Sequence, residues 1–139
     1  SHLSDQGAWD VLRLEAAPVL ASHSNSRALR GHPRNLTDEL FRAIVGSGGF
    51  VGVNFCIHFL GEKPAAETVA DHLEHFLALG GENHLGLGSD FDGTDVPEDL
   101  SGVQDLPKLW AILERRGFSS ELIHRLAWEN LNHFLHLLA

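Results

Sequence analysis

The sequence contains no methionine, a single cysteine and few basic residues. Because methionine is absent, Ser1 is not an untouched initiator, and we expect an internal or processed segment. The lone Cys56 excludes a disulfide bond within the chain and favours a reducing, cytoplasmic location. Apolar runs are also short. None approaches the roughly 20 residues that a transmembrane helix needs, so we expect no membrane span in this segment.

Positive charge is scarce, since 10 basic residues stand against 19 acidic ones and the formal net charge is -9. Arg27, Arg30, Arg34 and Arg42 form the one local basic cluster of the sequence, and acidic residues follow it closely. Nucleic-acid-binding proteins normally carry a basic patch, so nucleic acid is not an expected partner. The content of 43% hydrophobic and 21% charged residues is that of a globular domain.

Helical and strand patterns alternate along the chain. Apolar residues at helical spacing predict helices over residues 5–14, 37–47, 68–79, 106–116 and 119–138. Apolar, β-rich runs predict strands over residues 18–21, 50–55 and 84–88. This alternation predicts an α/β fold with a parallel sheet. Three strands close poorly by themselves, so we expect residues 1–139 to be the C-terminal part of a single (β/α)8 barrel domain whose N-terminal half is absent.

Side chains with chemical potential stand where the predicted strands end. His2 and His23 each lie where a strand would pass into a helix, and Asp90 follows the last strand. In a barrel, these positions converge on one mouth. Imidazole and carboxylate are the ligands and acid–base groups that suit zinc. The pattern alone leaves a metal site and a chance placement of two histidines equally open.

Simpler interpretations compete for the other candidates. Asp90 and Asp92, within Ser-Asp-Phe-Asp-Gly, also suit a turn whose carboxylates accept bonds from backbone amides. Arg34 suits either a solvated loop or, through its planar fork, a clamp on a substrate carboxylate. Most of the other histidines lie in helical patterns, which predicts partly buried or surface imidazoles: His72, His75, His124, His133 and His136.

Six runs of the sequence match one known family in the same order. They are residues 1–5, 18–25, 32–39, 52–55, 71–73 and 86–93, and together they span nearly the whole chain. In this order they resemble the C-terminal portion of the membrane (renal) dipeptidase family, whose members are zinc metallopeptidases. The resemblance implies a barrel of the amidohydrolase type, in which a hydroxide that bridges two metal ions attacks the peptide carbonyl.

The resemblance also implies roles for individual residues. His2 and His23 match the two histidines that bind the second zinc of a binuclear site. Arg34 matches the arginine that holds the C-terminal carboxylate of a dipeptide. Asp90 matches the acidic residue near the substrate amine, a candidate proton shuttle, whereas we expect Asp92 to be structural. The implied substrates are dipeptides, often including those with a D-residue at the C-terminal position.

Some family features have no counterpart in this sequence. A His-x-Asp on the first strand, a bridging glutamate and a substrate-contacting histidine would all belong upstream of Ser1. Cys56 and Phe59 stand where mammalian relatives carry phenols, which leaves the side-chain preference open. Trp128-Glu129-Asn130 replaces a Gly-Gly-Asn, which predicts a local packing change in the last helix.

Other kinds of protein therefore remain as alternatives. A barrel homologue or interaction module that lost the first metal site would also lack those ligands. A mononuclear deaminase of the same superfamily fits less well, because Arg34 and the Asp-Phe-Asp loop belong to the dipeptidase pattern. As an isolated piece, the chain would expose a strand edge and apolar faces, and we expect it to aggregate or to form a homodimer.

Overall fold

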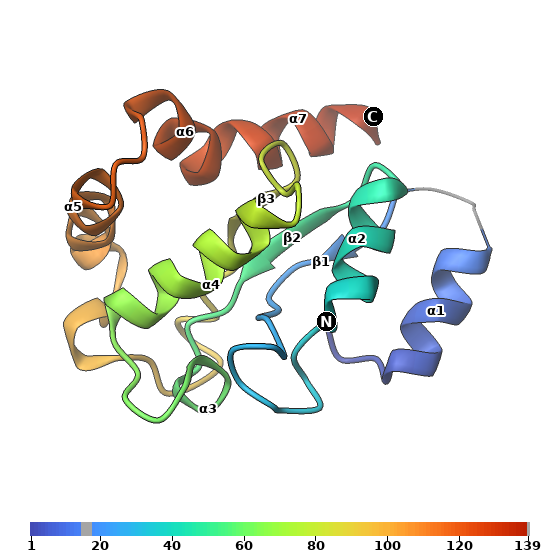
Figure 1. Ribbon diagram of the computed structural model, residues 1–139, viewed down its shortest axis with the longest axis horizontal. Helices are drawn as coiled ribbons and strands as arrows, with labels where there is room; N and C mark the ends of the chain where they lie inside the picture. The colour runs from blue at the N-terminus through green and yellow to red at the C-terminus, as the bar shows by residue number, and fades with distance from the viewer. Residues whose placement is uncertain (15–17, 139) are drawn as a thin grey trace.

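A parallel sheet lies at the centre of the computed structural model, which describes residues 1–14 and 18–138. Its strands are β1 (Leu20–Ala21), β2 (Phe50–Val53) and β3 (Leu85–Leu87), in that order across the sheet (Figure 1). Both strand pairings are parallel, so the carboxyl ends of all three strands face the same edge. The predicted parallel α/β arrangement is therefore confirmed for the described residues.

Helices connect the strands and cover the sheet. They are α1 (Asp5–Arg13), α2 (Asp38–Gly46), α3 (Ile57–Leu60), α4 (Ala66–Ala78), α5 (Leu106–Arg115), α6 (Ser120–His124) and α7 (Asn130–Leu137). Short 3-10 turns at Glu98–Leu100 and Val103–Asp105 precede α5. Figure 1 shows α4 crossing in front of the sheet and α1 lying beside α2. No helix among the described residues has the length and apolarity to cross a bilayer.

The helix boundaries follow local signals in the sequence. Ser4, Thr37 and Ser119 each accept a hydrogen bond from a backbone amide in the first turn of α1, α2 and α6, respectively. Each bond satisfies an amide that the helix itself leaves without a partner. Beyond the end of α4, Gly80 adopts a positive φ of 93°, which glycine tolerates without strain. These boundaries agree with the predicted ones to within two residues.

Strand β2 is buried on both of its faces. Val51 is fully buried on one face, and on the other Phe50 packs against Phe134 of α7, with ring centroids 5.9 Å apart. Phe41 of α2 stacks on Phe76 of α4, with ring centroids 4.2 Å apart. Burial of both faces explains why the strand sequence is continuously apolar rather than alternating.

The predicted single helix over residues 119–138 is wrong in its middle. A π-helical turn at Arg125–Glu129 separates α6 from α7. Immediately after it, the side-chain amide of Asn130 donates to the carbonyls of Glu82 and Leu85, each at 2.8 Å. The turn therefore places Asn130 where it joins the helix to the start of β3. Apolar spacing carries no sign of such a turn, because the Asn130 partners lie far away in the sequence.

Two smaller differences concern the segments around the site. Strand β1 covers only half of the predicted range, and its Leu20 side chain is 44% exposed. The loop expected after Phe55 contains the short helix α3, which carries Phe59. Strand β1 forms one edge of the sheet, and α3 follows the carboxyl end of β2.

Candidate metal centre

Two imidazole rings meet beyond the carboxyl end of β1. His2 precedes α1, His23 follows β1, and their Nε2 atoms are 2.9 Å apart. Two nitrogens bound to one tetrahedral zinc at about 2.0–2.1 Å would be about 3.3 Å apart. The observed 2.9 Å is the length of a hydrogen bond between the two rings, so the pair would need only a small separation to bind one ion together. The structure brings together the two histidines that the sequence singles out.

The surroundings of His23 favour its neutral form. Burial lowers the pKa of His23, the Asp90 carboxylate opposes this shift, and the neighbouring His2 adds to it. The His23 Nδ1 atom lies 2.8 Å from Ser22 Oγ, which leaves Nε2 facing His2. The backbone amide of His23 donates to Ser1 Oγ at 2.9 Å. Because metals bind the neutral imidazole, the ring is oriented and poised as a ligand.

Two buried asparagines join the strand ends behind the histidines. Asn25 donates through Nδ2 to the carbonyl of Asn54, and the amide of Asn54 donates to Asn25 Oδ1, at 2.9 and 2.8 Å. Asn54 Nδ2 in turn donates to Asp90 Oδ2 at 3.3 Å. These bonds connect the residues that follow β1, β2 and β3. The sequence placed the loop that begins at Asn54 at the same edge as the histidines, but it assigned no role to Asn54 or Asn25.

Asp90 has an unusual backbone conformation. Its φ is +62°, a left-handed value that non-glycine residues rarely adopt and that aspartate tolerates better than most. The amide of Gly93 donates to the Asp90 carbonyl at 3.0 Å, so the expectation of a turn is correct for the backbone. The carboxylate itself contacts Asn54, and its charge reaches His23. Asp90 therefore belongs to the same cluster as the histidine pair.

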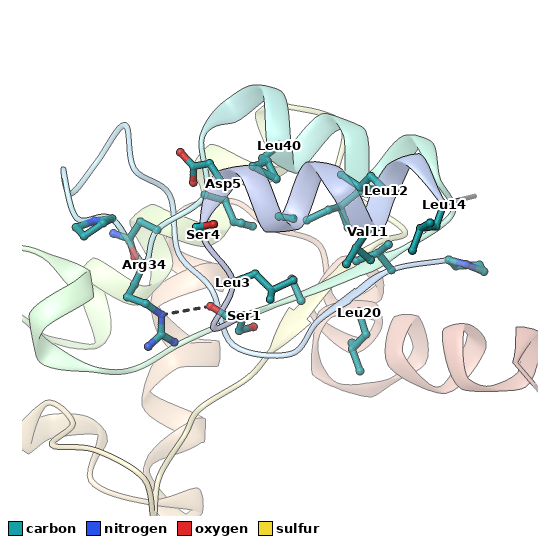
Figure 2. A pocket seen from close by; sticks show the side chains of 18 residues that line it. Ser1, Leu3, Ser4, Asp5, Val11, Leu12, Leu14, Leu20, Arg34 and Leu40 are labelled. Carbon is teal, nitrogen blue, oxygen red and sulfur yellow. Dashed lines mark hydrogen bonds between the residues drawn. The ribbon is translucent and has the colours of Figure 1, made fainter. Parts of the chain in front are cut away.

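Arg34 lies beside the histidine pair. Its Nε donates to the carbonyl of Ser1 at 3.2 Å, the dashed contact in Figure 2, and its guanidinium carbon lies 5.3 Å from the ring centroid of Phe59. In the part of the chain that the structure describes, its two terminal nitrogens donate to no acceptor. A guanidinium that is fixed through its Nε, while both terminal nitrogens can still donate, suits bidentate binding of a carboxylate.

An apolar pocket of about 360 Å³ lies next to this cluster, between α1, β1 and α2 (Figure 2). Leucine and valine side chains dominate its lining, among them Leu3, Val11 and Leu20. Ser1 and Arg34 reach its rim, but neither histidine lines it. An apolar lining does not match the charged ends of a dipeptide, so the pocket is not assigned to a dipeptide substrate.

The described residues supply part of a metal centre rather than a complete one. Among residues 1–14 and 18–138, no group of three or more histidine, cysteine, aspartate or glutamate side chains is arranged to hold a metal. Two imidazoles fit as ligands but do not complete a tetrahedral zinc site. Any metal bound here needs further ligands in addition to His2 and His23.

Two glycines, one in β2 and one just after β3, allow the backbone next to His23 to pack closely against these strands. A Cβ atom on Gly88 would overlap the carbonyl oxygen of Ser22, and one on Gly52 would overlap the same atom. We expect Gly88→Ala to lower the free energy of unfolding by about 1–3 kcal/mol, because backbone atoms cannot yield as a flexible side chain does. Gly31→Ala is the control, since nothing lies within 4 Å of its position. Equal denaturation midpoints for the two variants would contradict this prediction.

His72 of α4 contacts the loop that carries His23, at the backbone of Ser26. It is fully buried; its Nδ1 accepts from the backbone amide of Ser26 at 3.0 Å, and its Nε2 lies 3.0 Å from the carbonyl of Leu60. Burial lowers the pKa of His72, partly opposed by the Leu60 carbonyl and by Asp71. The ring is therefore neutral, and protonation at Nδ1 would break the bond to Ser26.

This arrangement predicts an acid-sensitive contribution to stability. Because the folded pKa of His72 is lowered, the contribution is present above the ordinary histidine pKa of about 6.5 and is lost as the pH falls through the lowered value. We expect His72→Gln to cost about 1–3 kcal/mol near neutral pH and to flatten the acid limb of the stability profile. Chemical denaturation across pH measures both, with exposed His133→Gln as the control. An unchanged acid limb in His72→Gln would show that another group causes it.

A parallel α/β sheet with two imidazoles meeting beyond the carboxyl end of one strand is compatible with a metal-dependent hydrolase. The chain belongs to the membrane dipeptidase family (peptidase family M19), which matches residues 1–136. The family predicted from the six sequence runs is confirmed. Proteins similar to the chain include a named dipeptidase and a metallopeptidase of this family.

Curated relatives extend well beyond the matched region. An uncharacterised protein encoded in the pqqA 5' region of Klebsiella pneumoniae is 40% identical over 136 residues, which are 94% of this chain and 50% of that protein. Dipeptidase ataJ of Aspergillus terreus is 37% identical over 135 residues, 94% of this chain and 33% of that protein. The chain thus spans between a third and a half of the length of these relatives.

Solved structures share the same fold. A metallopeptidase from Rhodobacter sphaeroides, liganded with a phosphinate mimic of the dipeptide L-Ala-D-Ala, superposes with a TM-score of 0.92 at 40% identity. The match covers 99% of this chain and 41% of that one. An amidohydrolase from Pseudomonas aeruginosa gives a TM-score of 0.88 at 26% identity, covering 99% of this chain and 51% of that one. Both likenesses support the α/β fold with its parallel sheet.

Proposed function

We propose that the protein is a zinc-dependent dipeptidase and that this chain supplies part of its active site. The observation that carries the proposal is the approach of His2 Nε2 to His23 Nε2 at 2.9 Å, with the Arg34 fork beside them. Two imidazole nitrogens next to a free guanidinium combine metal binding with carboxylate binding. A dipeptide presents a scissile carbonyl and a free carboxylate within one short molecule.

Each residue of the cluster has a separate task in this proposal. His2 and His23 hold one zinc ion of a binuclear site, and Arg34 binds the C-terminal carboxylate of the substrate. Asp90 holds and transfers a proton at its carboxylate, while the amide of Asn54 fixes one of its oxygens. When bound, zinc would polarise the peptide carbonyl and activate water. The substrate class follows the ligand of the Rhodobacter sphaeroides relative, a mimic of L-Ala-D-Ala.

The same proposal makes residues 1–139 the C-terminal part of a (β/α)8 barrel. Within the described residues, β1 and β3 each pair with a single neighbour, so both edges of the sheet can accept a further strand. The half-exposed Leu20 and the apolar pocket beside it lie along the β1 edge. A preceding strand of the same domain would cover them, and the N-terminal half of the barrel would supply the remaining metal ligands.

A barrel homologue without catalysis is the second candidate, because the described residues hold no complete metal-binding group. Hydrolysis of L-Ala-D-Ala by the intact polypeptide discriminates between the two. The dipeptidase proposal expects turnover that a chelator abolishes and that added zinc restores. Intact polypeptide that folds and binds zinc but releases no alanine would favour the homologue without catalysis.

A further inference from the structure

One guanidinium joins the three segments that carry His2, His23 and Arg34. Arg27 donates from Nη1 and Nη2 to the two carboxylate oxygens of Asp5, at 2.6 and 2.7 Å. Its Nε donates to the carbonyl of Asn35 at 2.8 Å, and Nη2 also donates to the carbonyl of Pro33 at 3.0 Å. Fork-to-fork pairing of this kind fixes orientation as well as distance.

Arg27 and its partners lie close in the sequence to His2, His23 and Arg34. Asp5 lies three residues after His2, and Arg27 lies four residues after His23. The two carbonyl acceptors belong to the residues on either side of Arg34, so they set the backbone from which that side chain projects. Figure 2 shows Asp5 at the start of α1, on the same side of the pocket as Arg34.

We propose that Arg27, paired with Asp5, is a positioning residue that sets the spacing of the two metal-binding histidines and the direction of the substrate-binding arginine. This inference rests on the proposed function, because it assigns the pair to the metal and carboxylate sites. The pair is partly exposed, with side-chain exposures of 27% for Arg27 and 46% for Asp5, so charge attraction alone contributes little to stability. The pair acts by fixing the positions of the three segments relative to one another.

Substitutions at Asp5 and at Arg27 remove different hydrogen bonds, so we expect them to change different measured quantities. Asp5→Asn removes the charged pair to the His2 segment and leaves the Asn35 and Pro33 contacts in place. We expect zinc affinity at one of the two metal sites to fall about 10-fold or more, as for other groups that orient a ligand, with KM nearly unchanged. Arg27→Lys cannot bridge all three segments, so we expect weaker zinc binding together with a higher KM for dipeptides.

The chain offers a matched control in the same helix. Asp10 pairs with Arg13 at the same 2.6 Å, but both side chains are more than half exposed and three residues apart in α1. Asp10→Asn therefore removes an aspartate–arginine pair of α1, held by one bond, that touches no part of the site. We expect its zinc affinity and KM to equal those of the parent protein.

The test is a zinc titration of the intact polypeptide against a chromophoric chelator, with KM for L-Ala-D-Ala and the melting temperature of the metal-free form measured in parallel. Weaker zinc binding in Asp5→Asn but not in Asp10→Asn supports the inference. Lower melting temperature in Asp5→Asn or Arg27→Lys with unchanged zinc affinity and KM overturns it and leaves the dipeptidase proposal intact. A parent protein that binds no zinc overturns both.

Discussion

Replacement of His23 by alanine should lower kcat/KM for dipeptide hydrolysis more than about 100-fold. Groups that merely orient a metal ligand typically cost 10- to 100-fold when removed, so loss of the ligand itself should cost more. The imidazole is oriented by Ser22 and lies 2.9 Å from its partner His2, so the variant removes one of the two proposed ligands outright. Steady-state kinetics on the intact polypeptide provides the measurement.

The control for this variant is His133→Ala, which removes an exposed imidazole from α7, away from the cluster. We expect its kcat/KM to equal that of the parent protein. Circular dichroism on both variants shows whether the fold is kept. Activity of folded His23→Ala within a few-fold of the parent would contradict its role as a ligand.

Replacement of Arg34 by alanine should raise KM for dipeptides about 30-fold or more, the equivalent of about 2 kcal/mol for a charged hydrogen-bonding partner. The Ser1 carbonyl and the Phe59 ring hold the guanidinium in place, so an incoming carboxylate meets an ordered fork. If the interaction is uniform through the reaction, kcat should change little. Dipeptide amides, which lack the free carboxylate, should be hydrolysed equally by variant and parent.

Arg42→Ala is the matched control, because Arg42 has the same charge and lies on the exposed face of α2. It should leave KM for dipeptides and for their amides unchanged. Equal loss of activity toward dipeptides and amides in Arg34→Ala would argue for general disruption of the site instead of carboxylate recognition.

The elements that local signals define were predictable from the sequence. Capping residues such as Ser4 and Thr37, with apolar residues at helical spacing, set the helices to within two residues. The meeting of His2 and His23 was also predicted, from the expectation that each histidine follows a strand of one parallel sheet, although only His23 follows a described strand. Neither inference needs knowledge of side-chain pairing over long distances.

The parts that were missed depend on such pairing. Trp128-Glu129-Asn130 predicted a local packing change in the last helix, but neither the π-helical turn at Arg125–Glu129 nor the bonds from Asn130 to carbonyls 45 and 48 residues away. The same holds for the bonds between Asn25 and Asn54, which span 29 residues, and for the Asp5–Arg27 pair, which spans 22. Sequence reasoning treated Arg27 as one member of a basic cluster, because the partner of a charged side chain depends on how the segments are folded together.

The zinc content of the intact polypeptide, compared with that of a His2→Ala, His23→Ala double variant, tests the central claim most directly. We expect about two equivalents of zinc in the parent and about one fewer in the double variant, together with loss of dipeptide hydrolysis. A double variant that keeps the full zinc content and full dipeptidase activity would contradict the assignment of these histidines as metal ligands.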